Sequence, residues 1–316
     1  MSTKKINQNL TNLASPKIGT KIIEVSDDFF GEASRMLDDK EPVFIEDKYD
    51  EHGKWMDGWE SKRRRDGGND WAIIELGSPG IITEIDIDTS FFTGNFPPFA
   101  SIEGLYSDQK PSKDSDWIEI LSKTSLKGDS SNKFKIESKT KVNYIKLQIF
   151  PDGGVARLRL FGEVKLNWDN YDNKNDLIEL SSLKLGGSIV AYNNAHYGDV
   201  SALLSHGRGK TMGDGWETRR RREPGNDWII IKLATKGLIR KIEIDTAHFK
   251  GNYPDQESVQ VSNFDKNKGL EELINDSHNW KYILDKSKLQ ADNIHNYEVN
   301  DTSIKDVTHV RLNIYP

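Results

Sequence analysis

One fifteen-residue segment of this sequence concentrates guanidinium groups, carboxylates and carboxamides. It runs from Asp57 to Trp71 and reads DGWESKRRRDGGNDW. A guanidinium group binds a carboxylate or a phosphate through two parallel hydrogen bonds, and neighbouring Asp, Glu and Asn side chains can accept from N–H groups. The segment therefore indicates a small ligand with an anionic end and amide-like N–H groups. For any single arginine the alternative is a solvated face, paired with Glu60, Asp66 or Asp70.

The same segment occurs a second time, from Asp214 to Trp228, as DGWETRRRREPGNDW. The two copies differ by 157 positions (214 − 57), and this offset holds without a gap as far as Pro97 and Pro254. A repeat of this length is a domain, because solenoid repeats are only roughly 20–50 residues long. Since charged residues recur together with the apolar ones, the whole segment is interpreted as functional.

A histidine distinguishes the second copy, because His248 stands where the first copy has Phe91. Histidine is the usual general acid or base near neutral pH, so His248 is a candidate catalytic residue. The alternative is a packing position that accepts either ring. The Gly-Asn pairs that follow, at Gly94 and Gly251, are interpreted as turns.

Composition narrows the class of protein. A chain of 316 residues can bury two cores, and the absence of cysteine excludes disulfides, thiolate metal sites and a cysteine nucleophile. The net charge of −6 disfavours general polyanion binding. No secretory leader or membrane-spanning run is recognisable, so we expect a soluble, cytoplasmic protein. No ligand spacing demands a metal or another cofactor, although a divalent metal is compatible with the many carboxylates.

The segments that must position the motif are short and alternate apolar with polar residues. In the first copy they cover residues 72–76, 83–89, 99–106, 117–121, 133–136, 143–150 and 156–161. Turn signals, such as the one at residues 77–80, separate them. Such a series predicts an all-β fold, an antiparallel sandwich or jelly roll.

Domain boundaries follow from the repeat. We expect a first domain over residues 1–165, a polar linker over 166–176 and a second domain over 177–316. Residues 1–25 are expected to form an irregular arm, and residues 29–37 and 266–275 to be helical. The second copy stops at Pro316, so we expect it to lack the strand that matches residues 156–161 and to expose a sheet edge, which would favour a homo-oligomer.

The duplicated motif, followed in each copy by Asp-Thr-x-x-Phe-x-Gly-Asn-(Phe/Tyr)-Pro, resembles the allantoicase (allantoate amidinohydrolase) family over nearly the whole chain. The resemblance implies tandem jelly rolls of the galactose-binding, discoidin-like type. It also implies hydrolysis of allantoate to ureidoglycolate and urea in purine (allantoin) degradation. The alternatives are a non-catalytic tandem module that binds an anionic small ligand or a glycan and, more remotely, a nucleic-acid binder that uses the arginines.

The chemistry of allantoate, the substrate that the resemblance implies, suggests roles for individual residues. An arginine would hold the carboxylate of allantoate, while acids and asparagines hold its ureido groups or transfer protons. Candidate catalytic residues are Glu60, Asp70, Glu217, Asp227 and His248. Candidate substrate-binding residues are Arg63, Arg64, Arg65, Asn69, Asp88, Arg157, Arg220, Arg221, Arg222, Asn226 and Asp245.

Overall fold

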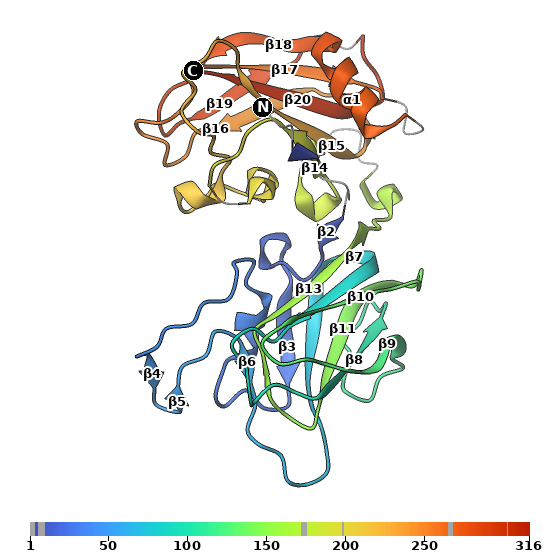
Figure 1. Ribbon diagram of the computed structural model, residues 1–316. Helices are drawn as coiled ribbons and strands as arrows, with labels where there is room; N and C mark the ends of the chain where they lie inside the picture. Colours follow the sequence, from blue (N-terminus) through green and yellow to red (C-terminus); the bar gives the residue numbers. More distant parts are fainter. Residues whose placement is uncertain (1–3, 6–9, 172–175, 198, 265–267, 302) are drawn as a thin grey trace. The chain divides into compact units, whose positions relative to one another are not determined.

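The chain forms two compact β units, shown as a computed structural model in Figure 1. The structure describes residues 4–5, 10–171, 176–197, 199–264, 268–301 and 303–316. The N-terminal unit comprises residues 10–167, and the C-terminal unit comprises residues 168–316 together with the first residues of the chain. The predicted all-β class with two related units is confirmed.

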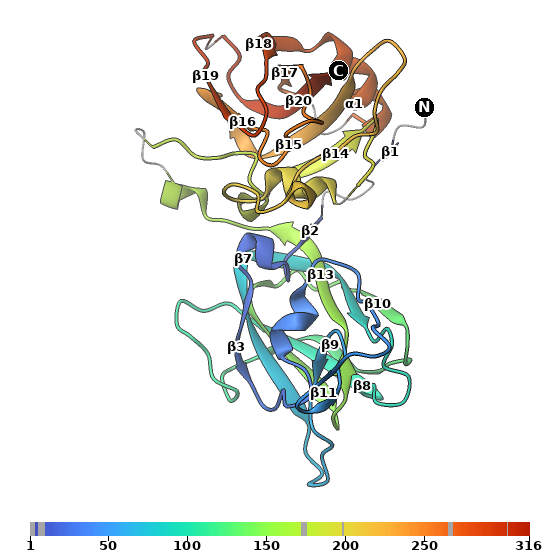
Figure 2. The same cartoon turned by 90° about the vertical axis from the view of Figure 1, so that its left-hand side faces the viewer.

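The N-terminal unit is built on two packed sheets. Its strands are β2 (Thr11–Asn12), β3 (Lys21–Val25), β4 (Tyr49–Asp50), β5 (Gly53–Lys54), β6 (Trp59–Glu60), β7 (Asp70–Asp88), β8 (Phe99–Leu105), β9 (Ile118–Ser125), β10 (Ser131–Lys135), β11 (Lys141–Phe150), β12 (Gly154–Val155) and β13 (Arg157–Val164). Its 3-10 helices are η1 (Pro16–Ile18) and η2 (Ala33–Leu37). Figure 2 shows η2 between β3 and β13, where the helical turns near residues 29–37 were predicted.

Strand β7 connects the two sheets of this unit. Its first half pairs with β3 and β11, and its second half pairs with β13 and β10. The predicted turn at residues 77–80 is wrong, because β7 continues through it. A side chain at Gly77 would lie 2.0 Å from the Ile18 carbonyl oxygen, and one at Gly80 would lie 2.7 Å from that of Glu163. These glycines serve close backbone approach rather than chain reversal.

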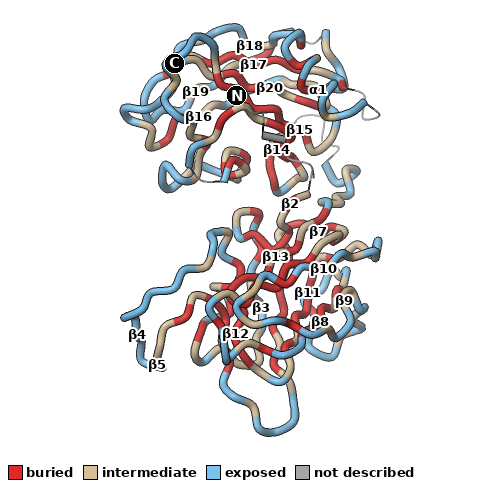
Figure 3. The backbone as a smooth tube through the Cα atoms, viewed as in Figure 1, coloured by how far each residue is buried: buried red, intermediate tan, exposed pale blue. Residues whose placement is uncertain are grey.

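The core of the N-terminal unit lies between the sheets. Ile73, Ile74, Ile85 and Ile87 of β7 are fully buried, and Figure 3 shows buried residues concentrated on the strands. Residues 21–25, which we expected in an irregular arm, form β3 instead. Their sequence, in which charged residues interrupt the apolar ones, suits a half-buried strand that pairs with β7.

The C-terminal unit repeats this arrangement with interruptions. Its strands are β1 (Lys4–Lys5), β14 (Ser188–Tyr192), β15 (Asp227–Gly237), β16 (Lys241–Asp245), β17 (Gln256–Ser262), β18 (Lys281–Lys288), β19 (Ile294–Glu298) and β20 (Val307–Tyr315). Its helices are η3 (Trp168–Tyr171), η4 (Leu183–Leu185), η5 (Val200–Leu204), η6 (Met212–Asp214), α1 (Leu270–Asp276) and η7 (Ser277–Asn279). The counterpart of β7 is divided into β15 and β16, and β16 pairs with β19. None of the helices in the described ranges is long and apolar enough to cross a membrane.

Candidate active site

A pocket of about 530 Å³ opens in the N-terminal unit beside the arginine motif. Two segments line it, the end of β3 and the connection from β6 to β7. The lining residues are Ser26, Asp27, Lys62, Arg63, Arg64, Arg65, Asp66 and Asp70. All three arginines of the motif therefore reach one cavity. The turn before β12 also helps to hold the motif, because the backbone N–H of Arg64 donates to Asp152 Oδ2 at 2.6 Å.

Arg64 is held between two carboxylates. Its Nη1 donates to Asp70 Oδ1 at 2.6 Å, and its Nε and Nη2 donate to the two oxygens of Asp66 at 3.0 Å each. The Arg64 guanidinium holds the pKa of the Asp66 carboxyl well below its usual range. Arg64 therefore orients the acids of the pocket, and most of its donors are already engaged.

Asp70 is the most deeply buried acid of this pocket, with 1% of its surface exposed. Its Oδ1 accepts from Arg64 and, at 2.9 Å, from the hydroxyl of Ser26. Its Oδ2 is buried and has no hydrogen-bond partner within the ranges that the structure describes. A buried carboxylate oxygen without a partner is costly, so a hydrogen-bond donor placed beside Oδ2 would stabilise Asp70.

Arg63 and Arg65 differ from Arg64 because both are exposed at the pocket. Within the described residues, neither guanidinium lies at ion-pair distance from a carboxylate. Two uncommitted guanidinium groups beside Asp70 can bind an anion in fork geometry. The side-chain amide of Asn69 is engaged elsewhere, since it donates to the Asp70 carbonyl at 3.2 Å and to Gln148 at 3.3 Å.

The same motif is more enclosed in the C-terminal unit. Arg221 Nη2 donates to Asp227 Oδ1 at 2.6 Å, as Arg64 does to Asp70. However, the Arg221 side chain is 9% exposed, against 29% for Arg64. Arg220 and Arg222 are exposed, and the amide of Asn226 donates to the Asp227 carbonyl at 3.0 Å and to Asn313 at 3.1 Å.

Glu60 and Glu217 form matching contacts outside the pocket lining. Glu60 accepts from the Asn95 amide at 2.6 Å, and Glu217 accepts from the Asn252 amide at 2.8 Å. Burial raises the pKa of Glu60, and the hydrogen bond from Asn95 opposes this rise. The asparagines of the two Gly-Asn pairs are thus fixed by glutamates of the motif in both copies.

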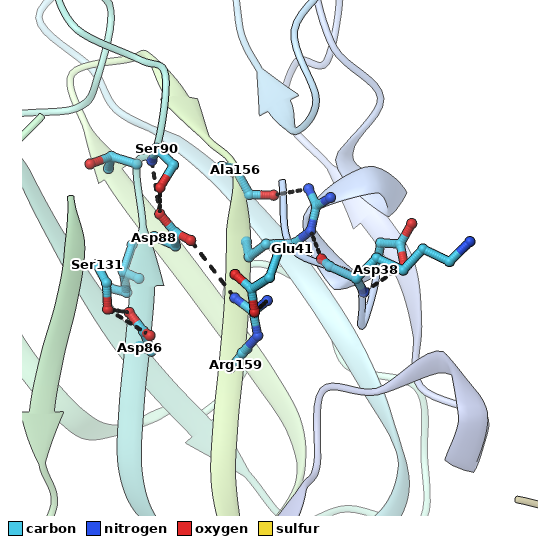
Figure 4. Close-up of polar contacts among 12 residues, drawn as sticks. Asp38, Glu41, Asp86, Asp88, Ser90, Ser131, Ala156 and Arg159 are labelled. Atoms are coloured by element: carbon cyan, nitrogen blue, oxygen red, sulfur yellow. Dashed lines mark hydrogen bonds and ion pairs between the residues drawn. The ribbon is translucent and has the colours of Figure 1, made fainter. Parts of the chain in front are cut away.

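Asp88 and Arg157 lie on neighbouring strands, β7 and β13, and both are buried. Figure 4 shows Asp88 between Ser90 and Arg159. Asp88 Oδ1 accepts from the backbone N–H and the hydroxyl of Ser90, at 2.8 and 2.6 Å, and Arg159 approaches Oδ2 at 3.8 Å. The guanidinium of Arg157 donates to the carbonyls of Lys40, Asp57 and Ala156 and to the Asp57 carboxylate. The nitrogens of the Arg157 guanidinium are therefore engaged in hydrogen bonds within the protein.

Asp245 and His248 lie in the corresponding region of the C-terminal unit. Asp245 Oδ2 accepts from Arg208 at 3.1 Å. His248 Nε2 lies 2.7 Å from the Gly209 carbonyl oxygen, and its backbone N–H donates to Asp292 Oδ1 at 2.8 Å. Both residues thus contact a loop around residues 208–209.

Four pocket residues are absent from the predicted site, namely Ser26, Asp27, Lys62 and Asp66. A signal for the first two exists, since Ser26-Asp27 directly follows the apolar run from Ile22 to Val25. The Ser26 hydroxyl in fact accepts from the Trp71 backbone N–H at 2.9 Å, which joins the two segments of the pocket. In the ranges that the structure covers, no group of three or more Asp, Glu or His side chains is arranged to hold a metal ion.

Comparisons with known proteins agree on one family. The family model for the allantoicase repeat matches residues 11–165 and 178–316. A probable allantoicase of Burkholderia mallei is 47% identical over 99% of this chain and 92% of that protein. One of Acinetobacter baylyi is 46% identical over 98% of this chain and 91% of that protein. The crystal structure of allantoicase from Saccharomyces cerevisiae covers 98% of this chain and 90% of its own, with 34% identity and a TM-score of 0.82.

Proposed function

This chain belongs to the allantoicase family and hydrolyses allantoate to ureidoglycolate and urea, and we propose that the pocket of the N-terminal unit binds and cleaves this substrate. The supporting observation is the unshared Oδ2 of buried Asp70 in a pocket lined by three arginines. Allantoate carries one carboxylate and two ureido groups on a single carbon. The arginines of the pocket are cations that can bind the substrate carboxylate, and Asp70 is an acceptor for the N–H groups of a ureido group.

Arg63 and Arg65 bind the substrate carboxylate in this proposal, because their guanidinium groups are uncommitted and exposed to the pocket. Arg64 holds Asp66 and Asp70 in place. Fixing the substrate in this way keeps its reacting carbon near Asp70 and removes the entropy cost from the chemical step.

Asp70 acts as the base. As one carbon–nitrogen bond breaks, Asp70 takes the N–H proton of the retained ureido group, and a carbon–nitrogen double bond forms. The leaving nitrogen takes this proton from Asp70 and departs as urea, which returns Asp70 to its carboxylate form. Water then adds across the double bond, its hydroxyl to carbon and its proton to nitrogen, which gives ureidoglycolate.

Glu60, Glu217 and Arg157 support the fold in this proposal rather than the reaction. The Glu-Asn contact is the same in both units, although Arg221 is more enclosed than Arg64. Because this contact does not depend on the state of the pocket, its role is to fix the loop that carries the asparagine. The guanidinium of Arg157 donates its hydrogen bonds to backbone carbonyls and to the Asp57 carboxylate.

The experiment measures urea release from allantoate by Asp70→Asn. We expect kcat to fall at least about 100-fold, since a general base contributes on the order of 10²–10⁴ in rate. Asp227→Asn, the matched change in the other unit, should keep near wild-type activity. Glu60→Gln, which preserves an acceptor for Asn95, should stay within about threefold of wild type. Normal turnover by Asp70→Asn would refute the assignment.

Self-association and a cytoplasmic location, both expected from the sequence, remain proposals. Light scattering coupled to gel filtration measures the first, and a single mass equal to one chain at micromolar concentration would contradict it.

A further inference from the structure

We infer that two asparagines, Asn193 and Asn194, close the motif of the C-terminal unit to ureido ligands, and that Ser26 and Asp27 keep the equivalent motif of the N-terminal unit open. This inference rests on the proposed function of the Asp70 pocket. It assigns a specificity-determining role to a dipeptide that lies outside the arginine motif.

The two dipeptides occupy equivalent places in the two units. The Trp71 backbone N–H donates to Ser26 Oγ at 2.9 Å, and that of Trp228 donates to Asn193 Oδ1 at 2.8 Å. The indole of Trp59 donates to the Asp27 carbonyl at 2.8 Å, and that of Trp216 donates to the Asn194 carbonyl at 2.9 Å. Backbone and tryptophan contacts therefore match pair by pair.

What differs is the supply of donors to the buried aspartate. In the C-terminal unit Asn193 donates to Asp227 Oδ1 at 3.1 Å, and Asn194 approaches Oδ2 at 3.5 Å. Both oxygens of Asp227 thus face an N–H donor of the protein. A carboxamide supplies two such donors on its own nitrogen.

In the N-terminal unit the same places hold a hydroxyl and a carboxylate. Ser26 supplies one donor, which goes to Asp70 Oδ1 at 2.9 Å. Asp27 has no donor when ionised, and its Oδ1 is taken by the backbone N–H groups of Lys62 and Phe29, at 2.7 and 3.2 Å. Asp70 Oδ2 is left without a partner in the described part of the chain.

The chemistry of the missing partner follows from these contacts. The unpartnered Oδ2 of Asp70 accepts an N–H or O–H donor, and Asn194 presents a primary carboxamide N–H to the equivalent oxygen of Asp227 at 3.5 Å. A ureido group presents the same kind of N–H donor. The asparagine of the C-terminal unit therefore occupies the place that the ureido group of a substrate takes in the N-terminal unit.

The test is the variant Asp27→Asn, alone and with Ser26→Asn, measured by urea release from allantoate in the full chain. We expect KM to rise roughly 10- to 100-fold, the factor that one hydrogen bond to a charged group is worth. The midpoint of thermal unfolding should not fall, because the new amide satisfies a buried oxygen. If Asp27 had only a structural role, its substitution would lower the midpoint of thermal unfolding and leave KM unchanged.

The control is Asn194→Asp in the C-terminal unit, which should leave KM and kcat unchanged and lower thermal stability, because it places two carboxylates together. If the double variant misfolds, the single Asp27→Asn variant still decides. Wild-type KM in a folded Asp27→Asn variant would overturn the inference. If Asp70→Asn is itself fully active, the proposed function fails instead, so the two failures are distinguishable.

Discussion

Arg63, Arg64 and Arg65 are consecutive in the sequence but have different surroundings, and this difference predicts different effects of the same substitution. Lys in place of Arg63 or Arg65 keeps the charge and loses the fork. We expect Arg63→Lys and Arg65→Lys to raise KM for allantoate about 10-fold or more, with kcat and thermal stability nearly unchanged. Steady-state urea release at varied allantoate concentration measures both constants.

Arg64→Lys should behave otherwise, because Arg64 donates to Asp66 and Asp70 at once. It should lower kcat and also stability, since Asp70 is buried and would lose its cation. Arg221→Lys is the matched control and should affect stability alone. An Arg64→Lys variant that shows only a change in KM would contradict the division of roles among the three arginines.

At this scale the sequence predicted the ligand chemistry, and the three arginines of the first copy line one pocket, but the sequence could not distinguish their surroundings. Arg64 and Arg221 occupy the same place in the repeat, yet their exposures differ. The difference is associated with Ser26 and Asp27, which lie about 40 positions earlier than Asp70 and belong to another strand end. Such a contact depends on how β3 pairs with β7, and no local pattern encodes it.

At the scale of elements, the loop after β7 and its counterpart after β16 share one unusual conformation. Phe91 has φ 68° and His248 has φ 67°, although neither is glycine. In each unit an aspartate from another loop accepts from the backbone N–H of this residue, Asp129 between β9 and β10 at 2.7 Å or Asp292 between β18 and β19 at 2.8 Å. The left-handed residue is thus held by a matching hydrogen bond whatever its ring.

This equivalence gives a prediction for His248→Phe, which installs the residue of the first copy. Activity with allantoate should stay within about twofold of wild type, because the loop conformation already accommodates phenylalanine. Stability should fall by about 0.5–1.5 kcal/mol through loss of the contact between Nε2 and the Gly209 carbonyl. Urea release and chemical denaturation measure the two effects. A loss of activity greater than tenfold would instead restore His248 as a catalytic residue.

At the scale of the whole molecule, the duplication let the sequence predict two related β units, and subsequent divergence limited what else it could predict. The period-two pattern located most strands, but it split β7 at Gly77 because glycines that admit a neighbouring backbone look like turn residues. Buried polar groups also diverged. Lys146 of β11 pairs with Glu103 at 2.7 Å, whereas Arg311 of β20 has Asn313 and Ser277 as partners.

Divergence has also placed an acid at one core position of β17 where the N-terminal unit has an apolar residue. Glu257 of β17 is fully buried and accepts a hydrogen bond from the Tyr297 hydroxyl, while its Oε2 has no partner among the described residues. By the 157-residue offset Glu257 matches Ala100, and by strand pairing Tyr297 matches Phe134. Burial raises the pKa of Glu257.

The last prediction concerns the pH dependence that Glu257 confers. A folded-state pKa above the ordinary value of 4.5 means that the folded state binds the proton more tightly, so the contribution of Glu257 to stability is complete below that value and is lost as pH rises through the raised pKa. Glu257→Gln keeps an acceptor for Tyr297 and removes the charge. We expect it to stabilise the chain by about 1–3 kcal/mol at pH 8 and much less at pH 5. Denaturation at both pH values, with hydrogen exchange of β17 and β19 to locate the effect, measures this. An equal effect of Glu257→Gln at the two pH values would show that the buried acid does not titrate with folding.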